Sequence, residues 1–329
     1  MHEKQKNFAH LSASERNEIS ILNLKGYSLR DIARALLRSV STISDEMHRN
    51  KVRNTYEPKK ADRKADTRRK QSKYQGMKIV EHSDLRKFVE EMLYDDQSPA
   101  NIAGRIKRHE KHLPTISKDS IYRFIESVYG RRIESHRKKR KKKPSRHRGR
   151  LMALSDRTFI DERPMHINAR MRVGDVEADF IVSGKSGRGI LLVVVDRKLR
   201  VAFIEQILEV SISNMHQAFL RIQQRFPEMR TITTDNDILF RHHTLLSKLL
   251  GVRIYFCHPY HSWEKGTVEN ANGVIRDDIP KGSDISRYSK RFIQGVEDKL
   301  NRRILECLDY LTPAEALVQV RKRKNARGV

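Results

Sequence analysis

The chain has 329 residues, 37% of them apolar and 33% charged, enough for two or three soluble domains with a sizeable core. Its 68 Lys and Arg against 41 Asp and Glu give a formal charge of +27, which favours a polyanionic partner, nucleic acid first. No uncharged apolar run of about 18 residues and no apolar signal peptide is present. We therefore expect a cytoplasmic protein with no membrane partner.

Basic charge is concentrated in three segments. Residues 51–75 hold ten Lys or Arg against three acids, "RRIESHRKKRKKKPSRHRGR" (131–150) holds twelve against one, and "RKRKNAR" (321–327) comes last. Like charges repel and such segments bury little, so we expect them to be flexible unless phosphates neutralise them. This predicts domains at 1–50, 84–130 and 166–320, basic linkers at 51–83 and 131–165, and a basic tail at 321–329.

The stretch "LSASERNEISILNLKGYSLRDIARALLRSVSTISDEMHRN" (11–50) predicts three short helices. Ser12 or Ser14 can cap the first, Ser28 the second and Ser39 the third. This is a helix-turn-helix pattern, in which the start of the last helix enters the major groove of DNA. A plain three-helix bundle would use the same apolar spacing, but short polar side chains at the recognition positions favour DNA binding.

The expected DNA contacts of this domain fall into two groups. Polar side chains at the start of the third helix would face bases, namely Ser39, Ser41, Thr42, Ser44 and Asp45. Arg38 and Arg49 would reach phosphates.

A second helical pattern lies between the two expected linkers. "DQSPANIAGRIKRHEKHLPTISKDSIYRFIESVYG" (96–130) has helix starts at Ser98 and Ser117. Two DNA-reading units in series would lengthen the recognised site, whereas a helical linker domain needs no DNA contact. The sequence is compatible with both interpretations.

The pattern changes to strands after residue 150. A strand in "RVGDVEADFIVSG" (172–184) is followed by two strands within 187–207, a helix at 214–225, and "TITTDND" (231–237), whose strand ends at Asp235. A helix, a strand at 252–257 and a helix at 265–276 follow. This order predicts a multidomain protein in which all-α helix-turn-helix domains precede an α/β ribonuclease-H-like domain with a mixed five-stranded sheet.

Three carboxylates are placed at strand ends and on one helix. Asp179 lies on the first strand, Asp235 ends the fourth, and Glu269 follows 34 residues later. Paired strands are about 4.8 Å apart, so Asp179 and Asp235 would repel each other unless cations lay between them. Two Mg²⁺ ions about 3.5 to 4 Å apart suit such oxygen ligands, with Mn²⁺ as a substitute.

Other candidate ligands have less support. Cys257 and Cys307 lack any zinc-ligand spacing, and we expect both to be core thiols. In "CHPYHSW", His258 and His261 are more consistent with hydrogen-bonding residues than with metal ligands. Tyr260 and Trp263 either stack on DNA or anchor the loop.

The helix that carries Glu269 also carries a cation. Arg276 follows Glu269 by seven residues, about 10.5 Å along a helix, so both side chains fall on one face. The glutamate can then hold metal while Arg276, together with Lys281 beyond it, binds DNA phosphate. Asn270 and Asn272 could position the DNA.

Three stretches carry a family resemblance that extends over nearly the whole chain: "GYSLRDIARALLRSVSTISDEMHRN", "SPANIAGRI" and "YFCHPYHSWEKGTVENANGVIRDDIPKG". The chain resembles a bacterial DDE transposase of insertion-sequence family thirty. The resemblance implies a nucleoid-associated bacterial protein in which Asp179, Asp235 and Glu269 are the catalytic acids that bind Mg²⁺. Asp175 and Glu177 share the strand of Asp179, whose sequence context fits the family pattern better.

One position departs from that pattern. The family normally has glycine after the second aspartate and its asparagine, and this chain has Asp237. Aspartate tolerates positive φ less readily than glycine, and a further charge beside the metals would alter their binding. Activity would be impaired by either effect and preserved if Asp237 points to solvent.

The sequence thus predicts a transposase that binds the inverted-repeat ends of an insertion sequence and catalyses Mg²⁺-dependent cleavage and transfer of DNA strands. Joining two ends to target DNA requires at least a dimer. The alternatives are a catalytically impaired DNA-binding repressor derived from a transposase, and a general nuclease or RNA-binding protein of the same fold.

Overall fold

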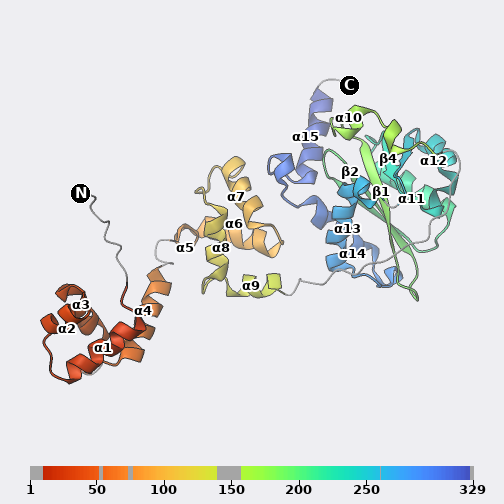
Figure 1. Ribbon diagram of the computed structural model, residues 1–329. Helices are drawn as coiled ribbons and strands as arrows, with labels where there is room; N and C mark the ends of the chain where they lie inside the picture. The colour runs from red at the N-terminus through yellow and green to blue at the C-terminus, as the bar shows by residue number, and fades with distance from the viewer. Residues whose placement is uncertain (1–9, 52–54, 73–76, 139–156, 260, 327–329) are drawn as a thin grey trace. The chain divides into compact units, whose positions relative to one another are not determined.

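The computed structural model describes residues 10–51, 55–72, 77–138, 157–259 and 261–326 (Figure 1). The chain divides into two compact units, residues 1–77 and 78–329. No helix among the described residues is long and apolar enough to cross a membrane.

The first unit begins with the three expected helices, α1 (Ala13–Leu24), α2 (Leu29–Ala35) and α3 (Val40–Asn50). The caps are Ser12, Ser28 and Ser39, whose hydroxyls accept from backbone N–H groups three residues later. Ser12 also forms a capping box with Glu15. Apolar side chains from all three helices form one core, including Ile19, Ile32, Ile43 and Met47.

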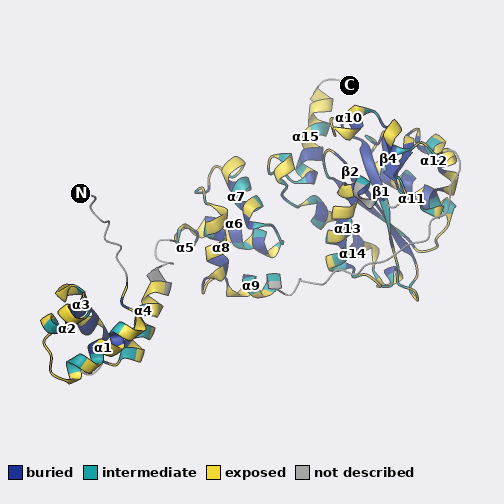
Figure 2. Cartoon of the chain, in the orientation of Figure 1, coloured by how far each residue is buried: buried dark blue, intermediate teal, exposed yellow. Residues whose placement is uncertain are grey.

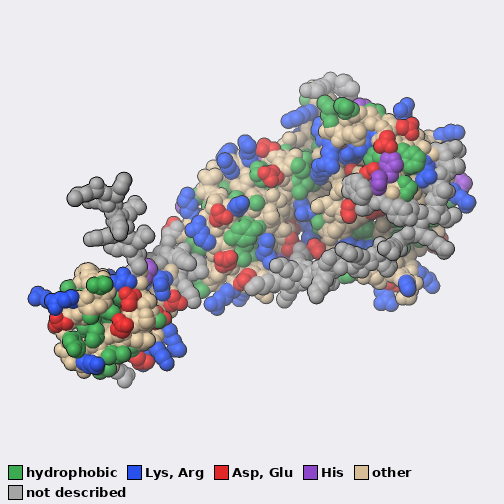
Figure 3. All heavy atoms as spheres, in the orientation of Figure 1, with side chains coloured by type: hydrophobic (Ala, Val, Ile, Leu, Met, Phe, Trp, Pro, Cys, Tyr) green, Lys and Arg blue, Asp and Glu red, His purple; other side chains and the backbone are tan. Residues whose placement is uncertain are grey.

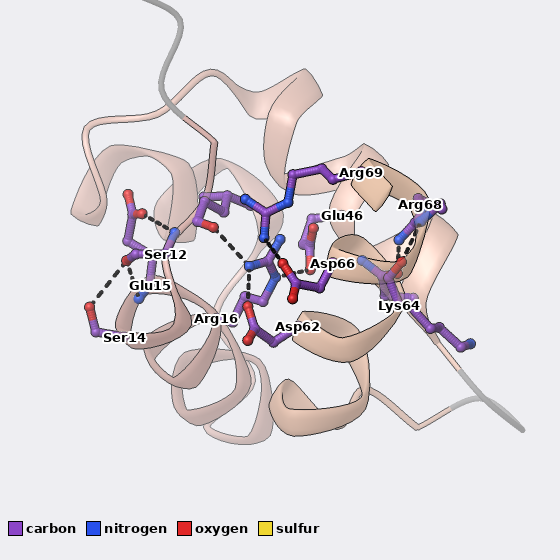
Figure 4. Close-up of polar contacts among 12 residues, drawn as sticks. Ser12, Ser14, Glu15, Arg16, Glu46, Asp62, Lys64, Asp66, Arg68 and Arg69 are labelled. Atoms are coloured by element: carbon purple, nitrogen blue, oxygen red, sulfur yellow. Dashed lines mark hydrogen bonds and ion pairs between the residues drawn. The ribbon is translucent and has the colours of Figure 1, made fainter. Parts of the chain in front are cut away.

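The first basic segment, predicted from the sequence to be a linker, contains a helix that packs on the first domain. Residues 58–72 form helix α4 (Pro58–Ser72), which packs on α1 and buries Ala61 completely. Arg16 of α1 is buried and donates to Glu46 of α3 at 2.9 Å and to Asp62 of α4 at 2.8 Å (Figure 4). The prediction of a linker rested on the net charge of the segment. It did not consider that single residues such as Asp62 could pair with buried partners and attach a basic helix to the core.

The second unit starts with five helices, α5 (Lys78–Glu81), α6 (Ser83–Tyr94), α7 (Pro99–Arg108), α8 (Lys118–Glu126) and α9 (Arg131–Lys138). Ser98 and Ser117 cap α7 and α8 as expected. The start of the expected second linker is helical, because α9 covers 131–138; residues 139–156 lie outside the described residues.

This helical part is attached to the C-terminal end of the same unit. Arg105 of α7 makes two bonds of 2.7 Å to Glu315, and the Gln97 side chain accepts from the backbone N–H of Ile304 at 2.9 Å. Gly104 lies so close to the Tyr310 ring that a Cβ there would overlap it. The helical part and the sheet domain therefore share an interface within one unit.

The strands are β1 (Asp175–Val182), β2 (Ile190–Asp196), β3 (Ala202–Ile207), β4 (Thr231–Thr234) and β5 (Arg253–Phe256). They form one five-stranded sheet in the order β3-β2-β1-β4-β5, in which β1 is antiparallel to β2 and parallel to β4. The predicted mixed sheet and ribonuclease-H-like arrangement are confirmed.

Helices cover both faces of this sheet (Figure 1). One core lies between the sheet and helices α11 (Ile212–Arg225) and α12 (His243–Leu250), and the other between the sheet and helices α13 (Gly266–Asp278) and α14 (Lys290–Asn301). The strands of the central sheet are buried (Figure 2). The short elements are η1 (Ile160–Glu162), α10 (Met165–Asn168), η2 (Ile238–His242), η3 (Ser262–Lys265), η4 (Ile285–Arg287) and η5 (Glu306–Leu308).

Two further expectations fail near the C-terminus. Cys257 is buried as expected, but Cys307 is exposed, because it lies in the short turn η5 and not in the sheet. The expected basic tail starts inside helix α15 (Pro313–Ala326), where Arg321 pairs with Glu228 at 3.0 Å; residues 327–329 lie outside the described residues.

Candidate active site

The site is centred on Asp179 and Asp235. Their strands β1 and β4 pair in parallel, and the last aligned pair is Glu177 with Thr233, so each aspartate lies two residues beyond it. Lys265 occupies the space between them, with its Nζ 2.9 Å from Asp179 Oδ1 and 3.2 Å from Asp235 Oδ2. The topology thus brings two predicted site residues to one cation.

Burial and charge oppose each other at this lysine. Burial raises the pKa of Asp179, and the nearby Lys265 offsets this only in part. Burial disfavours the charged form of Lys265, but the attraction of Asp179 and Asp235 outweighs it, and the pKa of Lys265 is raised. Lys265 therefore stays protonated and supplies the positive charge that the two carboxylates require.

Helix α13 lies against Asp179 with one face. Asn272 donates from Nδ2 to Asp179 Oδ2 at 2.6 Å, and Lys265 just before the helix contacts the same aspartate. Glu269 is four residues after Lys265 and three before Asn272, which places it on this face, with an exposed side chain.

The expected DNA-binding cations follow on the same helix. Arg276, four residues after Asn272, is half-buried; burial lowers its pKa and Asp179 opposes that change. Lys281 is exposed beyond the helix end. Arg276 therefore lies on the side of the acids, and Lys281 lies further along the chain.

Two other carboxylates of β1 have structural partners. Asp175 is buried and bonded to Arg172 at 2.9 Å and to the Thr231 hydroxyl at 2.7 Å. Glu177 is buried, pairs with Arg197 at 3.0 Å, and accepts two backbone N–H groups at the start of α13. These bonds leave Asp179 as the carboxylate of β1 that faces the open site.

Asp237 does not need a glycine backbone. Its φ of −67° and ψ of 143° are ordinary, and its carboxylate caps η2 by accepting from the Leu239 N–H at 2.9 Å. Its charge does affect the site, because burial, with Asp235 and Asp179 nearby, raises the pKa of Asp237. The prediction that Asp237 would strain the backbone is therefore wrong for this structure. The prediction that its charge would alter metal binding remains, because its carboxylate lies near Asp235 and Asp179.

Two buried oxygens at the site have no hydrogen-bond partner among the described residues, Asp235 Oδ1 and Asn272 Oδ1. Buried acceptors of this kind are costly unless a donor or cation meets them. Together with Asp179, they make an oxygen-rich donor set that fits a hard divalent cation.

Sequence reasoning did not assign a role to Lys265. Its position directly before the helix of Glu269 is visible in the sequence, but its contact with Asp179 spans 86 residues and depends on the tertiary fold. Tyr260 and the Trp263 side chain, for which stacking was considered, lie outside the described part of the chain.

Known proteins are similar to this chain over both of its units. A model described as a helix-turn-helix domain matches residues 7–50. The chain is 34% identical over 320 residues to the transposase for insertion sequence element IS4351 of Bacteroides fragilis, covering 94% of this chain and 96% of that protein. It is 32% identical to the transposase InsI for IS30A of Escherichia coli K12, covering 96% and 85%.

The chain belongs to the IS30 family of insertion-sequence transposases. Among solved structures, the catalytic core domain of BIV integrase matches with a TM-score of 0.37 and 19% identity, covering 46% of this chain and 98% of that one.

In this family member, the expected recognition helix is α3. Its exposed face carries Ser41, Ser44 and Arg49, and also His48, which sequence reasoning did not select. Ser39 is the helix cap, and its hydroxyl lies 2.7 Å from that of Thr42.

Arg38 is less available for phosphate than expected. Its Nε donates to Glu15 at 2.8 Å, and the pair is only about a quarter exposed, at 26% and 22%. Arg49 is 65% exposed and lies 4.0 Å from Asp45, so its charge is open to solvent. The geometry thus favours Arg49 over Arg38 for contact with DNA.

Proposed function

We propose that this protein binds the inverted-repeat ends of an insertion sequence, cuts a DNA strand there, and transfers the resulting 3′-hydroxyl to target DNA. The observation that carries the proposal is that Asp179 and Asp235, at two adjacent strand ends, both contact the ammonium group of Lys265. Membership of a transposase family supports the class of reaction.

Asp179, Asp235 and Glu269 would hold two Mg²⁺ ions, and Mn²⁺ is an alternative. When bound, such ions activate an attacking oxygen and stabilise the departing one at a phosphodiester. The donor set fits them, because it consists of carboxylate oxygens and includes the unpartnered Asp235 Oδ1.

The chain's own residues orient these acids. Asn272 holds Asp179 through a 2.6 Å bond, which fixes the carboxylate relative to α13 and so to Glu269. Lys265 satisfies both aspartates in the metal-free protein and can turn toward a DNA phosphate when cations take its place. Arg276 and Lys281 extend the positive charge along the bound strand.

DNA recognition is proposed for the exposed face of α3, with Ser41, Thr42 and Ser44 near bases, Arg49 on phosphate, and lesser roles for Ser39 and Arg38. Lys and Arg side chains are spread over both units (Figure 3). Bringing two DNA ends and a target together requires at least two copies of the chain. Binding should weaken by about 10³ to 10⁵ from 50 to 200 mM salt if six to ten phosphates are contacted.

The test uses the full chain and DNA carrying the inverted repeats that flank its gene. We expect Mg²⁺-dependent nicking and strand transfer by the wild type, and loss of both in Asp179→Asn, Asp235→Asn and Glu269→Gln. Glu209→Gln is the matched control, because Glu209 is an exposed acid on a loop.

The same assays separate the alternatives. A wild type that protects the ends in footprinting but is as inactive as Asp235→Asn indicates a repressor, for which the charge of Asp237 is the motivating observation. Restored cleavage in Asp237→Gly would then identify the cause. Cleavage without preference for the ends indicates a general nuclease.

A further inference from the structure

Two histidines and a glutamate lie together in the loop between β5 and α13. His258, His261 and Glu264 each offer a ligand atom, and these atoms are all within 4.8 Å of one another. The side chains are 31%, 43% and 16% exposed, so solvent and ions can reach them. Figure 3 shows His side chains beside acidic ones on the visible face of the second unit.

The distances are close to those of an occupied metal site. Glu264 Oε1 is 3.0 Å from His258 Nδ1 and 3.2 Å from His261 Nδ1. Tetrahedral zinc with bonds of about 2.0 to 2.1 Å places neighbouring ligand atoms roughly 3.3 to 3.5 Å apart. Glu264 Oε1 therefore needs to move only a few tenths of an ångström from each ring nitrogen to admit such an ion, which would replace the hydrogen bonds that these atoms make with one another.

Further contacts hold these groups in orientation. Asp161 Oδ2 is 2.8 Å from His258 Nε2, which matches the arrangement in which a carboxylate orients a metal-binding imidazole through its other nitrogen. The His258 backbone N–H donates to Glu264 Oε2 at 2.9 Å, leaving Oε1 to face both rings. Phe159 stacks on His258 with 5.3 Å between ring centroids.

We propose that His258, His261 and Glu264 bind one zinc-type transition metal ion, with a water molecule as a fourth ligand. Two imidazole nitrogens and one carboxylate favour Zn²⁺, whereas Mg²⁺ prefers the all-oxygen set of Asp179 and Asp235. Both histidines form hydrogen bonds to Glu264, as expected from the sequence. The inference adds a metal-binding role for them, and it does not depend on the proposed reaction.

The proposed metal site adjoins the site of the acids along the chain. Glu264 directly precedes Lys265, whose Nζ contacts Asp179 and Asp235, and Gly266 begins the helix that carries Glu269.

The experiment measures Zn²⁺ binding to the metal-free full chain by competition with a chromophoric chelator, in excess Mg²⁺. We expect one tightly bound Zn²⁺ per chain, and the d–d absorption spectrum of tetrahedral Co²⁺ when Co²⁺ replaces it. His258→Ala, His261→Ala and Glu264→Ala should each weaken binding more than the roughly 10- to 100-fold expected for Asp161→Asn, the loss of an outer partner.

Controls locate the ion. His166→Ala removes an exposed histidine elsewhere, and Asp179→Asn alters the other acid site; both should keep the wild-type zinc affinity and cobalt spectrum. Circular dichroism checks that each variant is folded. The proposal is overturned if the wild type binds no stoichiometric Zn²⁺, if folded His258→Ala and His261→Ala bind as the wild type does, or if Asp179→Asn abolishes binding.

Discussion

Two groups of carboxylates lie within a few residues of each other on the sheet, and their surroundings differ. The inner acids Asp175, Glu177 and Asp196 are at most 1% exposed and bonded to arginines or backbone N–H groups. The outer acids Asp179 and Asp235 are 25% and 47% exposed and share the Lys265 ammonium. The inner acids are bonded to groups of the folded core. The outer acids contact the ammonium group of Lys265, whose place a metal ion would take in the proposed reaction.

The difference shows how one strand serves two purposes. Glu177 and Asp179 are two residues apart on β1, but Glu177 accepts the first N–H groups of α13 while Asp179 meets the side chains of that helix. The inner acid thereby holds the helix, and the helix presents Lys265 and Asn272 to the outer acid. Four predictions test this division.

The largest effect is expected for removal of an outer charge. Asp179→Asn and Asp235→Asn should lower strand transfer by on the order of 10³-fold or more, about 4 kcal/mol in activation free energy, because the site loses a ligand charge. Thermal melting should change little. A variant that keeps near-normal strand transfer in a gel assay contradicts the assignment of that acid.

Removal of an inner charge should instead affect folding. Glu177→Gln leaves the buried Arg197 without its anion, and breaking such a pair costs about 3 to 5 kcal/mol of unfolding free energy. Denaturant titration at neutral pH measures the change. An unfolding free energy equal to that of the wild type would show that Glu177 has no structural role.

A pH experiment examines Asp196, whose pKa is raised by burial from 3.8 to about 6. The folded state then binds a proton more tightly than the unfolded state. The resulting stability is fully present below about pH 4 and is lost as pH rises through 6. Asp196→Asn should lack this loss, on the order of 2 kcal/mol. Denaturant titrations at pH 4 and pH 7 compare the two proteins; equal pH dependence contradicts the prediction.

The smallest effect concerns the shared lysine. Lys265→Met leaves Asp179 and Asp235 facing each other without a cation, so the metal-free protein should melt a few degrees lower, for a cost of about 1 kcal/mol. Mg²⁺ should raise the melting temperature of the variant more than that of the wild type. An identical Mg²⁺ response in both would show that Lys265 does not occupy the cation position.

Local signals predicted much of this structure. Serine caps located α2, α3, α7 and α8, and short runs of apolar and β-branched residues located the five strands, because both depend on neighbours in the chain. Strand order then brought Asp179 toward Asp235. The role of Lys265 and the packing of α4 depend on partners such as Asp179 and Arg16 that are distant in sequence. The cluster of His258, His261 and Glu264 has a spacing of three residues, and Glu264 lies in the short turn η3, but its closeness to Asp161 depends on a partner that is distant in sequence.

The bidentate contact between Arg105 and Glu315 has a consequence for how DNA reaches the acids. It fastens the helical part 78–138 to the sheet domain, and the close fit of Gly104 on Tyr310 leaves no room for a side chain between them. If the second helical pattern also reads DNA, a duplex bound by α8 would be held at a fixed distance from Asp179. The distance between the recognised DNA sequence and the phosphodiester that is cut would then be set by the structure of the protein.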